Sequence, residues 1–210
     1  MIIKTLEVGP IETNCYVVAD EKTLRCAVID PGADVYAILD FMESLKLKCE
    51  AILLTHAHFD HVGAVEDLME ETGAPLYMCQ KDCGVPIGSW GDVYNPPEGT
   101  KFYSDGQIVS VSDIYFAVME TPGHTPGSVT LMCTQEGEEY KVLFTGDTLF
   151  RDSCGRTDFA SSDPRQMMAS LRRLAQLPDD YEVYPGHMDS SNLDRERSFN
   201  YYMKYANNQR

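Results

Sequence analysis

Three of the five histidines in this 210-residue chain lie in one short segment, ILLTHAHFDHVGA, between an apolar run and a glycine. They are His56, His58 and His61, and Asp60 stands directly before the last of them. Imidazole nitrogens and carboxylate oxygens are ligands that suit zinc, iron and manganese. Because His56 and His58 alternate along an extended backbone, both can reach one ion while Asp60 and His61 turn towards another. The spacing therefore predicts a metal site.

Three more candidate ligands stand in short loops further along the chain. His124 lies in TPGHTPGS, Asp147 in FTGDTLF and His187 in YPGH. Each is expected at the end of a strand, so these loops can converge on one edge of a sheet with the first cluster. Seven candidates are too many for one tetrahedral ion and suit two ions that share a bridging carboxylate. An isolated histidine is more often an ordinary core or surface residue, but five in such loops favour a metal site.

The pattern of apolar residues predicts the elements that position these loops. Alternation typical of strands is found in the segments 2–8, 14–20, 24–30, 107–120, 128–133, 139–144 and 181–185. Helical spacing predicts four helices: one after Asp34 as N-cap, one from Val62 to near Gly73, one opened by Asp163-Pro164, and one from about Leu193. The continuous apolar run CEAILLT indicates a buried strand with the histidine cluster at its carboxyl end, where open α/β sheets bind ligands.

The composition restricts the class of protein. Hydrophobic residues make up 43% of the chain, and no linker or repeat divides it, so we expect a single domain over residues 1–210. The formal net charge of -16 argues against nucleic acid or a membrane surface as partner, because both attract clustered Lys and Arg. Seven scattered cysteines, with no signal-peptide pattern and no membrane-length apolar run, predict a cytoplasmic protein with reduced thiols. The expected partner is a small-molecule substrate.

Taken together, the motifs resemble those of the metallo-β-lactamase superfamily, in which H-x-H-x-D-H is followed downstream by His, Asp and His. The resemblance extends along the whole chain. GPIETNCYVV and AVIDPG are similar to the opening strands of the family, and TPGHTPGSV, FTGDTLF, CGRTDF and YPGH to its later loops. Among its branches, the chain is most similar to glyoxalase II and its single-domain relatives. The resemblance implies an α/β fold, the four-layer αβ/βα sandwich, with the site at one edge between two β-sheets.

The resemblance also assigns all seven candidates as ligands of two divalent ions: His56, His58 and His124 for the first, Asp60, His61 and His187 for the second, and Asp147 as the bridge. The carboxylates Asp60 and Asp147 are in addition the candidate catalytic residues. Zinc is favoured over iron or manganese. Asp30 matches a family position that orients metal ligands, but it is equally well explained as a turn residue before Pro31.

Two divalent ions can lower the pKa of a shared water enough to give a bridging hydroxide, which can attack an ester or thioester carbonyl. We therefore expect a metal-dependent hydrolase of small thioesters or esters. A rival hypothesis is a persulfide dioxygenase, a branch that also has a CGRTDF segment; His56, His124 and Asp147 would then hold a single iron. YPGH, in place of the alanine-containing version usual in that branch, favours the hydrolase. A non-catalytic metal-binding protein is the third hypothesis, and the intact ligands argue against it.

Departures from the family restrict the expected substrate. The chain ends soon after His187, so we expect it to lack the helical domain that supplies basic residues to glutathione in full-length glyoxalase II. Arg156 matches a glutathione-contact position, but Asp158 replaces a tyrosine near it. Arg156 either pairs with Asp158 or clamps the substrate, and the ion pair is favoured. The commonest zinc β-lactamases have a cysteine where Asp147 stands. We therefore expect neither glutathione dependence nor β-lactam hydrolysis as the main activity.

Two further features allow more than one interpretation. The segment 84–100 is rich in Gly and Pro and indicates a long loop, which in a compact domain is often functional. Its Trp90 and Tyr94 either line a substrate pocket or anchor the loop on the core. Cys79 and Cys83 are spaced as zinc ligands can be, but no second pair follows, so ordinary thiols are expected.

Overall fold

Two six-stranded sheets form the centre of the protein. The structure is a computed structural model that describes residues 1–86, 93–137 and 141–208. The first sheet contains, in spatial order, β1 (Ile2–Val8), β2 (Thr13–Ala19), β3 (Arg25–Ile29), β4 (Lys48–Leu53), β5 (Leu76–Met78) and β6 (Lys101–Phe102). The β1–β2 and β2–β3 pairs are antiparallel, whereas β3 to β6 run parallel to one another. The carboxyl ends of β3, β4 and β5 therefore lie at the same edge of the sheet.

The second sheet is built from the later part of the chain. In spatial order it contains β14 (Ser191–Asn192), β13 (Glu182–Pro185), β10 (Lys141–Gly146), β9 (Val129–Gln135), β8 (Ile114–Glu120) and β7 (Ile108–Val111). Its neighbouring strands are antiparallel except for β10 and β13, which run parallel. A separate two-stranded hairpin, β11 (Leu149–Phe150) and β12 (Ser153–Cys154), follows β10.

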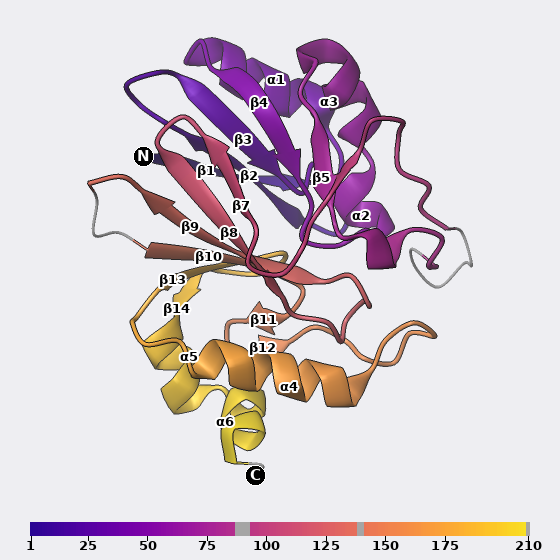
Figure 1. Cartoon of the computed structure of the whole chain (residues 1–210), viewed down its shortest axis with the longest axis vertical. Coiled ribbons are helices and arrows are strands. Elements are labelled where there is room, and N and C mark those ends of the chain that lie inside the picture. Colours follow the sequence, from indigo (N-terminus) through magenta and orange to yellow (C-terminus); the bar gives the residue numbers. More distant parts are fainter. Residues whose placement is uncertain (87–92, 138–140, 209–210) are drawn as a thin grey trace.

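Helices cover the outer face of each sheet (Figure 1). The helices α1 (Val35–Ser44) and α3 (Val65–Thr72) pack on the first sheet, and α4 (Pro164–Ala175) and α6 (Tyr201–Asn208) pack on the second. The shorter helices are α2 (Phe59–Val62), η1 (Gln80–Asp82) and α5 (Leu193–Phe199). The order helix, sheet, sheet, helix is the four-layer αβ/βα sandwich, so the predicted fold class is confirmed. Within the described residues, no helix has the length and apolar character needed to cross a membrane.

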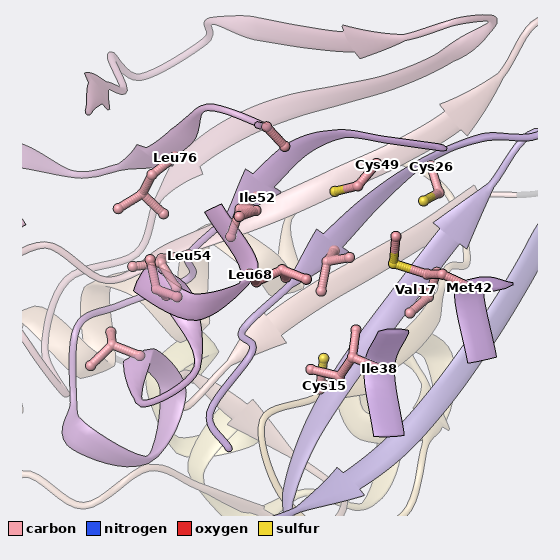
Figure 2. Close-up of a cluster of buried hydrophobic side chains, with 14 of the residues drawn as sticks. Cys15, Val17, Cys26, Ile38, Met42, Cys49, Ile52, Leu54, Leu68 and Leu76 are labelled. Carbon is pink, nitrogen blue, oxygen red and sulfur yellow. The ribbon is translucent and has the colours of Figure 1, made fainter. Parts of the chain in front are cut away.

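Three apolar cores fill the spaces between these layers. Alternate side chains of a strand point to opposite faces, so Cys15 and Val17 of β2 pack beneath the helices while Tyr16 and Val18 pack between the sheets. Figure 2 shows the core beneath the helices, where Ile38 of α1 lies near Cys15. Every residue of β2 is buried, because both faces of the strand are covered. All seven cysteines are free thiols, as expected.

Some local predictions are wrong, and competing contacts explain why. Asp34 precedes α1, but its side chain does not cap the helix; its backbone is left-handed (φ 54°), and its Oδ2 accepts a hydrogen bond of 2.8 Å from the N–H of Gly9. The segment 107–120 forms the β7–β8 hairpin, which turns at Ser112 (φ 52°), and not one strand. The cap predicted at Asp163 is confirmed, since its side chain accepts from two N–H groups of α4.

Candidate metal centre

The loops that carry the predicted ligands meet at one edge between the two sheets. The segment with His56 and His58 follows β4 and leads into α2, while His124 lies between β8 and β9. Asp147 follows β10, and His187 follows β13. Because β10 and β13 run parallel, their carboxyl ends place Asp147 and His187 at the same edge.

Hydrogen bonds between the sheets fix the YPGH loop at this edge. The backbone N–H of Asn14 in β2 donates to the carbonyl of Gly186 at 2.8 Å, and its side-chain Nδ2 donates to the carbonyl of Pro185 at 3.1 Å. The hydroxyl of Tyr16 donates to the same Pro185 carbonyl at 2.5 Å. The opening segment GPIETNCYVV, which forms part of the first sheet, thus holds the YPGH loop of the second sheet and with it His187.

Six of the seven candidate ligands form two groups, each with its atoms within 4.8 Å of one another: His56, His58 and His124 in one, and Asp60, His61 and His187 in the other. His56 and His61 also form such a group with Asp30, so the two groups adjoin. In the second group, Nε2 of His61 and Nε2 of His187 lie 3.3 and 3.2 Å from the same oxygen, Oδ2 of Asp60. Ligand atoms bound at about 2.0–2.1 Å to a tetrahedral ion are separated by about 3.3–3.4 Å. The second group therefore has the spacing of a metal site.

Asp147 lies between the two groups. Its Oδ2 is 3.3 Å from Nε2 of His124, and its Oδ1 is 3.5 Å from Nε2 of His61. One carboxylate thus reaches both groups, as a bridging ligand must. The structure brings all seven predicted ligands together, and their arrangement fits a dinuclear metal site. The division of the ligands between the two ions stays a prediction.

Several of these atoms need a cation as partner. Nε2 of His56, Nε2 of His61 and Oδ1 of Asp147 are buried and have no hydrogen-bond partner among the described residues. Each buried polar atom without a partner costs about 1–3 kcal/mol of stability. Two divalent ions would give all three atoms a partner, so the residues present fit the implied metal ions.

Asp30 orients a ligand of the second group and is more than a turn residue. Its Oδ2 lies 3.0 Å from Nδ1 of His61, and its two oxygens accept hydrogen bonds from the N–H and the hydroxyl of Thr55 at 2.7 and 2.6 Å. Since an ionised carboxylate only accepts, Nδ1 of His61 carries a proton, which leaves its Nε2 as the atom that can bind a metal ion. The structure therefore supports the first of the two interpretations of Asp30.

A backbone carbonyl orients the ring of His124, as Asp30 orients that of His61. The Nδ1 of this ring lies 2.8 Å from the carbonyl oxygen of Arg156, so Nδ1 is the donor and Nε2 faces Asp147. The carbonyl of His124 accepts a hydrogen bond of 2.8 Å from the hydroxyl of Ser162. The CGRTDF segment is thus joined to the ligand loop through its backbone.

Two residues near the site were not predicted. The hydroxyl of Thr13 donates to Oδ2 of Asp60 at 2.9 Å. Asp82, at the end of η1, is buried and accepts from the hydroxyl of Thr125 at 2.9 Å and from the N–H of Gly127 at 2.6 Å, both in the His124 loop. Thr13 stands in the segment GPIETN, and the similarity of this segment to the family could have indicated a role for Thr13. Nothing in the local sequence CQKDCG singles out Asp82.

Two histidines of the first group, His56 and His58, are kept neutral by their surroundings. Burial, reinforced by the neighbouring histidines, lowers the pKa of His56 well below its usual value. Burial and His124 lower the pKa of His58 to about 4. Neutral imidazole is the form that ligates a metal ion.

The second group favours positive charge. Burial opposes a charge on His61, but Asp30 and Asp147 outweigh it and raise the pKa of His61 well above its usual value. Burial likewise opposes the charge of Asp60, yet the nearby imidazoles of His187 and His61 hold the pKa of Asp60 far below its usual range. An ionised carboxylate beside groups that attract positive charge is what a cation site requires.

Glycine is needed where the YPGH and CGRTDF loops approach Asp147. A Cβ on Gly186 would lie 2.2 Å from Oδ1 of Asp147 and 2.8 Å from Cε1 of His61. A Cβ on Gly155 would lie 1.9 Å from the carbonyl oxygen of Asp147. The glycine of YPGH therefore permits the close approach of His187 to the other ligands.

The site opens into a cavity of about 490 Å³, with His58, Asp60, His124, Asp147 and His187 in its wall. Arg156 also lines it, and its guanidinium makes two hydrogen bonds with the carboxylate of Asp158, at 2.9 and 2.8 Å. The predicted ion pair is thus confirmed.

The 84–100 loop contributes no cavity-lining residue among its described positions. Tyr94 is buried against the core beneath the helices, which supports the anchoring interpretation, while Trp90 lies outside the described residues. In the described part of the chain, Cys79 and Cys83 belong to no group that could hold a metal ion.

The chain is similar to known proteins along nearly its whole length. A family model described as the metallo-beta-lactamase superfamily matches residues 8–187. Hydroxyacylglutathione hydrolase GloC of Haemophilus influenzae is 31% identical, over 95% of this chain and 97% of that protein. The crystal structure of BLEG-1 B3 metallo-beta-lactamase is 31% identical with a TM-score of 0.85, over 96% of this chain and 99% of that one. The structure of TTHA1623 in a di-iron-bound form is 34% identical with a TM-score of 0.80, over 95% and 99% of the two chains.

This protein belongs to the metallo-β-lactamase superfamily. Within the superfamily it is a metallo-hydrolase, whose clustered histidines and aspartates form the metal-binding site.

Proposed function

We propose that this protein hydrolyses small thioesters or simple esters with the help of two divalent metal ions. The observation that carries the proposal is the pair of adjacent ligand groups that share Asp147 in the wall of an open cavity. The name of the Haemophilus influenzae relative, a hydroxyacylglutathione hydrolase, supports a thioester as the substrate. Zinc is the expected metal, and the di-iron-bound form of TTHA1623 makes iron the principal alternative.

Bound divalent ions would acidify a water molecule and polarise the carbonyl of the substrate. The chain itself sets the geometry in which this takes place. Asp147 reaches both ligand groups and so fixes their separation. The hydroxyl of Thr13 donates a hydrogen bond to Oδ2 of Asp60, the same oxygen that lies near Nε2 of His61 and of His187. These contacts support the proposal that the two carboxylates are the catalytic residues.

The chemistry needs no nucleophile from the side chains. Cys154 lines the cavity, but burial raises the pKa of its thiol to about 11. A thiol with that pKa is protonated near neutral pH, and only the thiolate is a good nucleophile. Direct attack by water on the carbonyl is therefore the favoured route.

The charges around the cavity argue against a dependence on glutathione. Among the described residues that line the cavity, Arg156 is the one Lys or Arg side chain, and its guanidinium is already paired with Asp158. An anionic substrate group would have to compete with that carboxylate. We therefore propose a small, weakly charged substrate, converted in the cytoplasm without a nucleic acid or membrane partner.

The direct test is an assay of protein reloaded with zinc, manganese or iron on the acetyl thioester of N-acetylcysteamine and on an aryl acetate. We expect metal-dependent release of thiol or phenol that is lost after chelation and restored by metal. Oxygen consumption with glutathione persulfide, together with a single bound iron, would instead identify a dioxygenase. Preferential hydrolysis of a chromogenic cephalosporin would identify a β-lactamase. Tight metal binding without turnover of any of these compounds would identify a non-catalytic metal-binding protein.

A further inference from the structure

The mouth of the cavity carries large apolar side chains that face solvent. Ile11, Phe59 and Met188 line the cavity and are 46%, 49% and 63% exposed. They come from three separate places: the β1–β2 turn, the start of α2 and the loop after β13. A single exposed apolar residue is ordinary, but several gathered around one opening mark a ligand-binding surface. We call these three residues the apolar collar.

The apolar surface continues from the collar to the metal ligands. The ring of Phe159 lies 5.3 Å from the ring of His58, and the ring of Phe150 lies 6.1 Å from that of His187. Both phenylalanines line the cavity. A substrate whose carbonyl reaches either ligand group therefore passes between apolar walls.

Among the described residues, the two arginines beside the mouth are already paired with carboxylates. Arg156 is paired with Asp158 and stacks on the ring of Phe159, with 4.8 Å between the guanidinium carbon and the ring centroid. Arg151, next in sequence to Phe150, lies 3.3 Å from the carboxylate of Asp189. With a net charge of -16, the chain as a whole also repels anions.

We propose that the apolar collar binds an uncharged hydrocarbon substituent of the substrate, so that the preferred substrates are thioesters or esters with a short alkyl chain. This inference rests on the proposed function and names its substrate class. The cavity volume of about 490 Å³ lies within the range of about 300–1,000 Å³ that is usual for small-molecule sites.

Two series of thioesters test the proposal. One lengthens the acyl group on N-acetylcysteamine from acetyl through butyryl to hexanoyl, and the other keeps the acetyl group and lengthens an uncharged alkyl thiol. Transfer of a methylene from water to an apolar surface favours binding by up to about fourfold. We expect kcat/KM to rise about two- to fourfold per methylene in at least one series. Succinyl, which places a carboxylate at the end of a four-carbon chain, should react at least about tenfold more slowly than butyryl.

Variants then assign the effect to the collar. Ile11→Ser combined with Met188→Ser removes two of its side chains, while Phe59 is left intact because it begins α2, the helix that carries both Asp60 and His61. Ile108→Ser is the matched control, since Ile108 is 60% exposed on β7 and does not line the cavity. The double variant should lose the chain-length dependence, and the control should keep it.

Binding of an inert ligand gives a second readout that does not depend on turnover. The S-hexyl thioether of N-acetylcysteamine, measured by calorimetry, should bind the wild type and the Ile108→Ser control equally and the double variant more weakly.

The outcomes separate this inference from the function on which it rests. Hydrolysis of the acetyl thioester without chain-length dependence in either series would overturn the collar proposal and leave the proposed function standing. A chain-length dependence that the double variant retains, or a succinyl thioester that reacts as fast as the butyryl one, would overturn it too. Metal-loaded protein that hydrolyses no thioester or ester would overturn the proposed function itself.

Discussion

The backbone N–H of Ala57 donates a hydrogen bond of 3.0 Å to Oδ2 of Asp82. Ala57 lies between two predicted ligands, and the other partners of the Asp82 carboxylate, Thr125 and Gly127, lie one and three positions after a third, His124. One buried carboxylate thus joins the loop after β4 to the loop between β8 and β9. These two loops carry all three ligands expected for the first metal ion, so Asp82 fixes their relative position.

Replacing Asp82 with Asn should weaken metal binding more than it weakens the fold. The amide has one acceptor oxygen in place of two, so at least one donor in the two loops loses its partner. Loss of a residue that orients metal ligands commonly costs about 10–100-fold in metal affinity. We expect a loss in that range for one of the two ions, measured by competitive metal titration of the metal-free protein.

Asp20→Asn is the matched control for this variant. Asp20 is also buried and accepts from the N–H of Lys22 at 2.9 Å and from the hydroxyl of Thr23 at 2.8 Å, and these partners lie outside the ligand loops. This variant should lower thermal stability without changing metal affinity. Equal losses of metal affinity in the two variants would show that Asp82 contributes only to general stability.

The seven ligands predict two metal ions per chain. Elemental analysis of freshly purified protein, followed by titration of the metal-free form, should reach a stoichiometry of two. Binding should also raise the melting temperature, because ligand at about 1,000 times its Kd stabilises the folded state by about 4 kcal/mol. A single tightly bound iron, with no affinity for a second ion, would contradict this expectation and favour the dioxygenase.

Asp147→Ala should abolish hydrolysis. The side chain reaches both ligand groups, so its loss separates the two ions and removes their joint action on water. We expect turnover to fall by more than about a hundredfold, with fewer than two ions retained. Asp105→Ala is a suitable control, because Asp105 is paired with Arg173 on the surface, away from the cavity. Wild-type turnover in Asp147→Ala would mean that the working site is not dinuclear.

Gly186→Ala should disturb the same metal centre through the YPGH loop. The added Cβ would lie 2.2 Å from Oδ1 of Asp147, so either the carboxylate or the YPGH loop must move. Displacements near 1 Å in a catalytic site can cost about a hundredfold in rate. We expect a loss of turnover and of one metal ion that is out of proportion to the change in melting temperature.

Gly73→Ala provides the comparison for Gly186→Ala. Gly73 ends α3 with a positive φ of 68°, and nothing lies within 4 Å of the position that its Cβ would take. This variant should lose stability through backbone strain and keep its metal content and turnover. A Gly186→Ala protein that behaves in the same way would show that the loop accommodates the methyl group.

Site features that depend on the spacing of neighbouring residues could be predicted from the sequence. Features that depend on contacts between residues far apart in the chain could not. The cluster at His56, the YPGH loop and the pairing of Arg156 with Asp158 could each be predicted from a few neighbouring residues. Asp82 could not, because its partners lie 25, 43 and 45 positions away. The error at Asp34 has the same origin. The local pattern predicts that its side chain caps a helix, but the side chain accepts a hydrogen bond from the N–H of Gly9, 25 positions away.

The last prediction concerns glutathione. Because Arg156 is already paired with Asp158, the tripeptide of a glutathione thioester should gain little binding energy at this site. Binding energy from remote substrate groups normally raises catalytic efficiency. Exchanging glutathione for a small neutral thiol on the same acyl group should therefore lower kcat/KM by less than about tenfold, or about 1.4 kcal/mol of transition-state binding. Asp158→Ala, which frees the guanidinium, should raise the preference for the glutathione thioester. A wild-type preference of several hundredfold would instead reveal a glutathione-binding surface that the paired arginine does not account for.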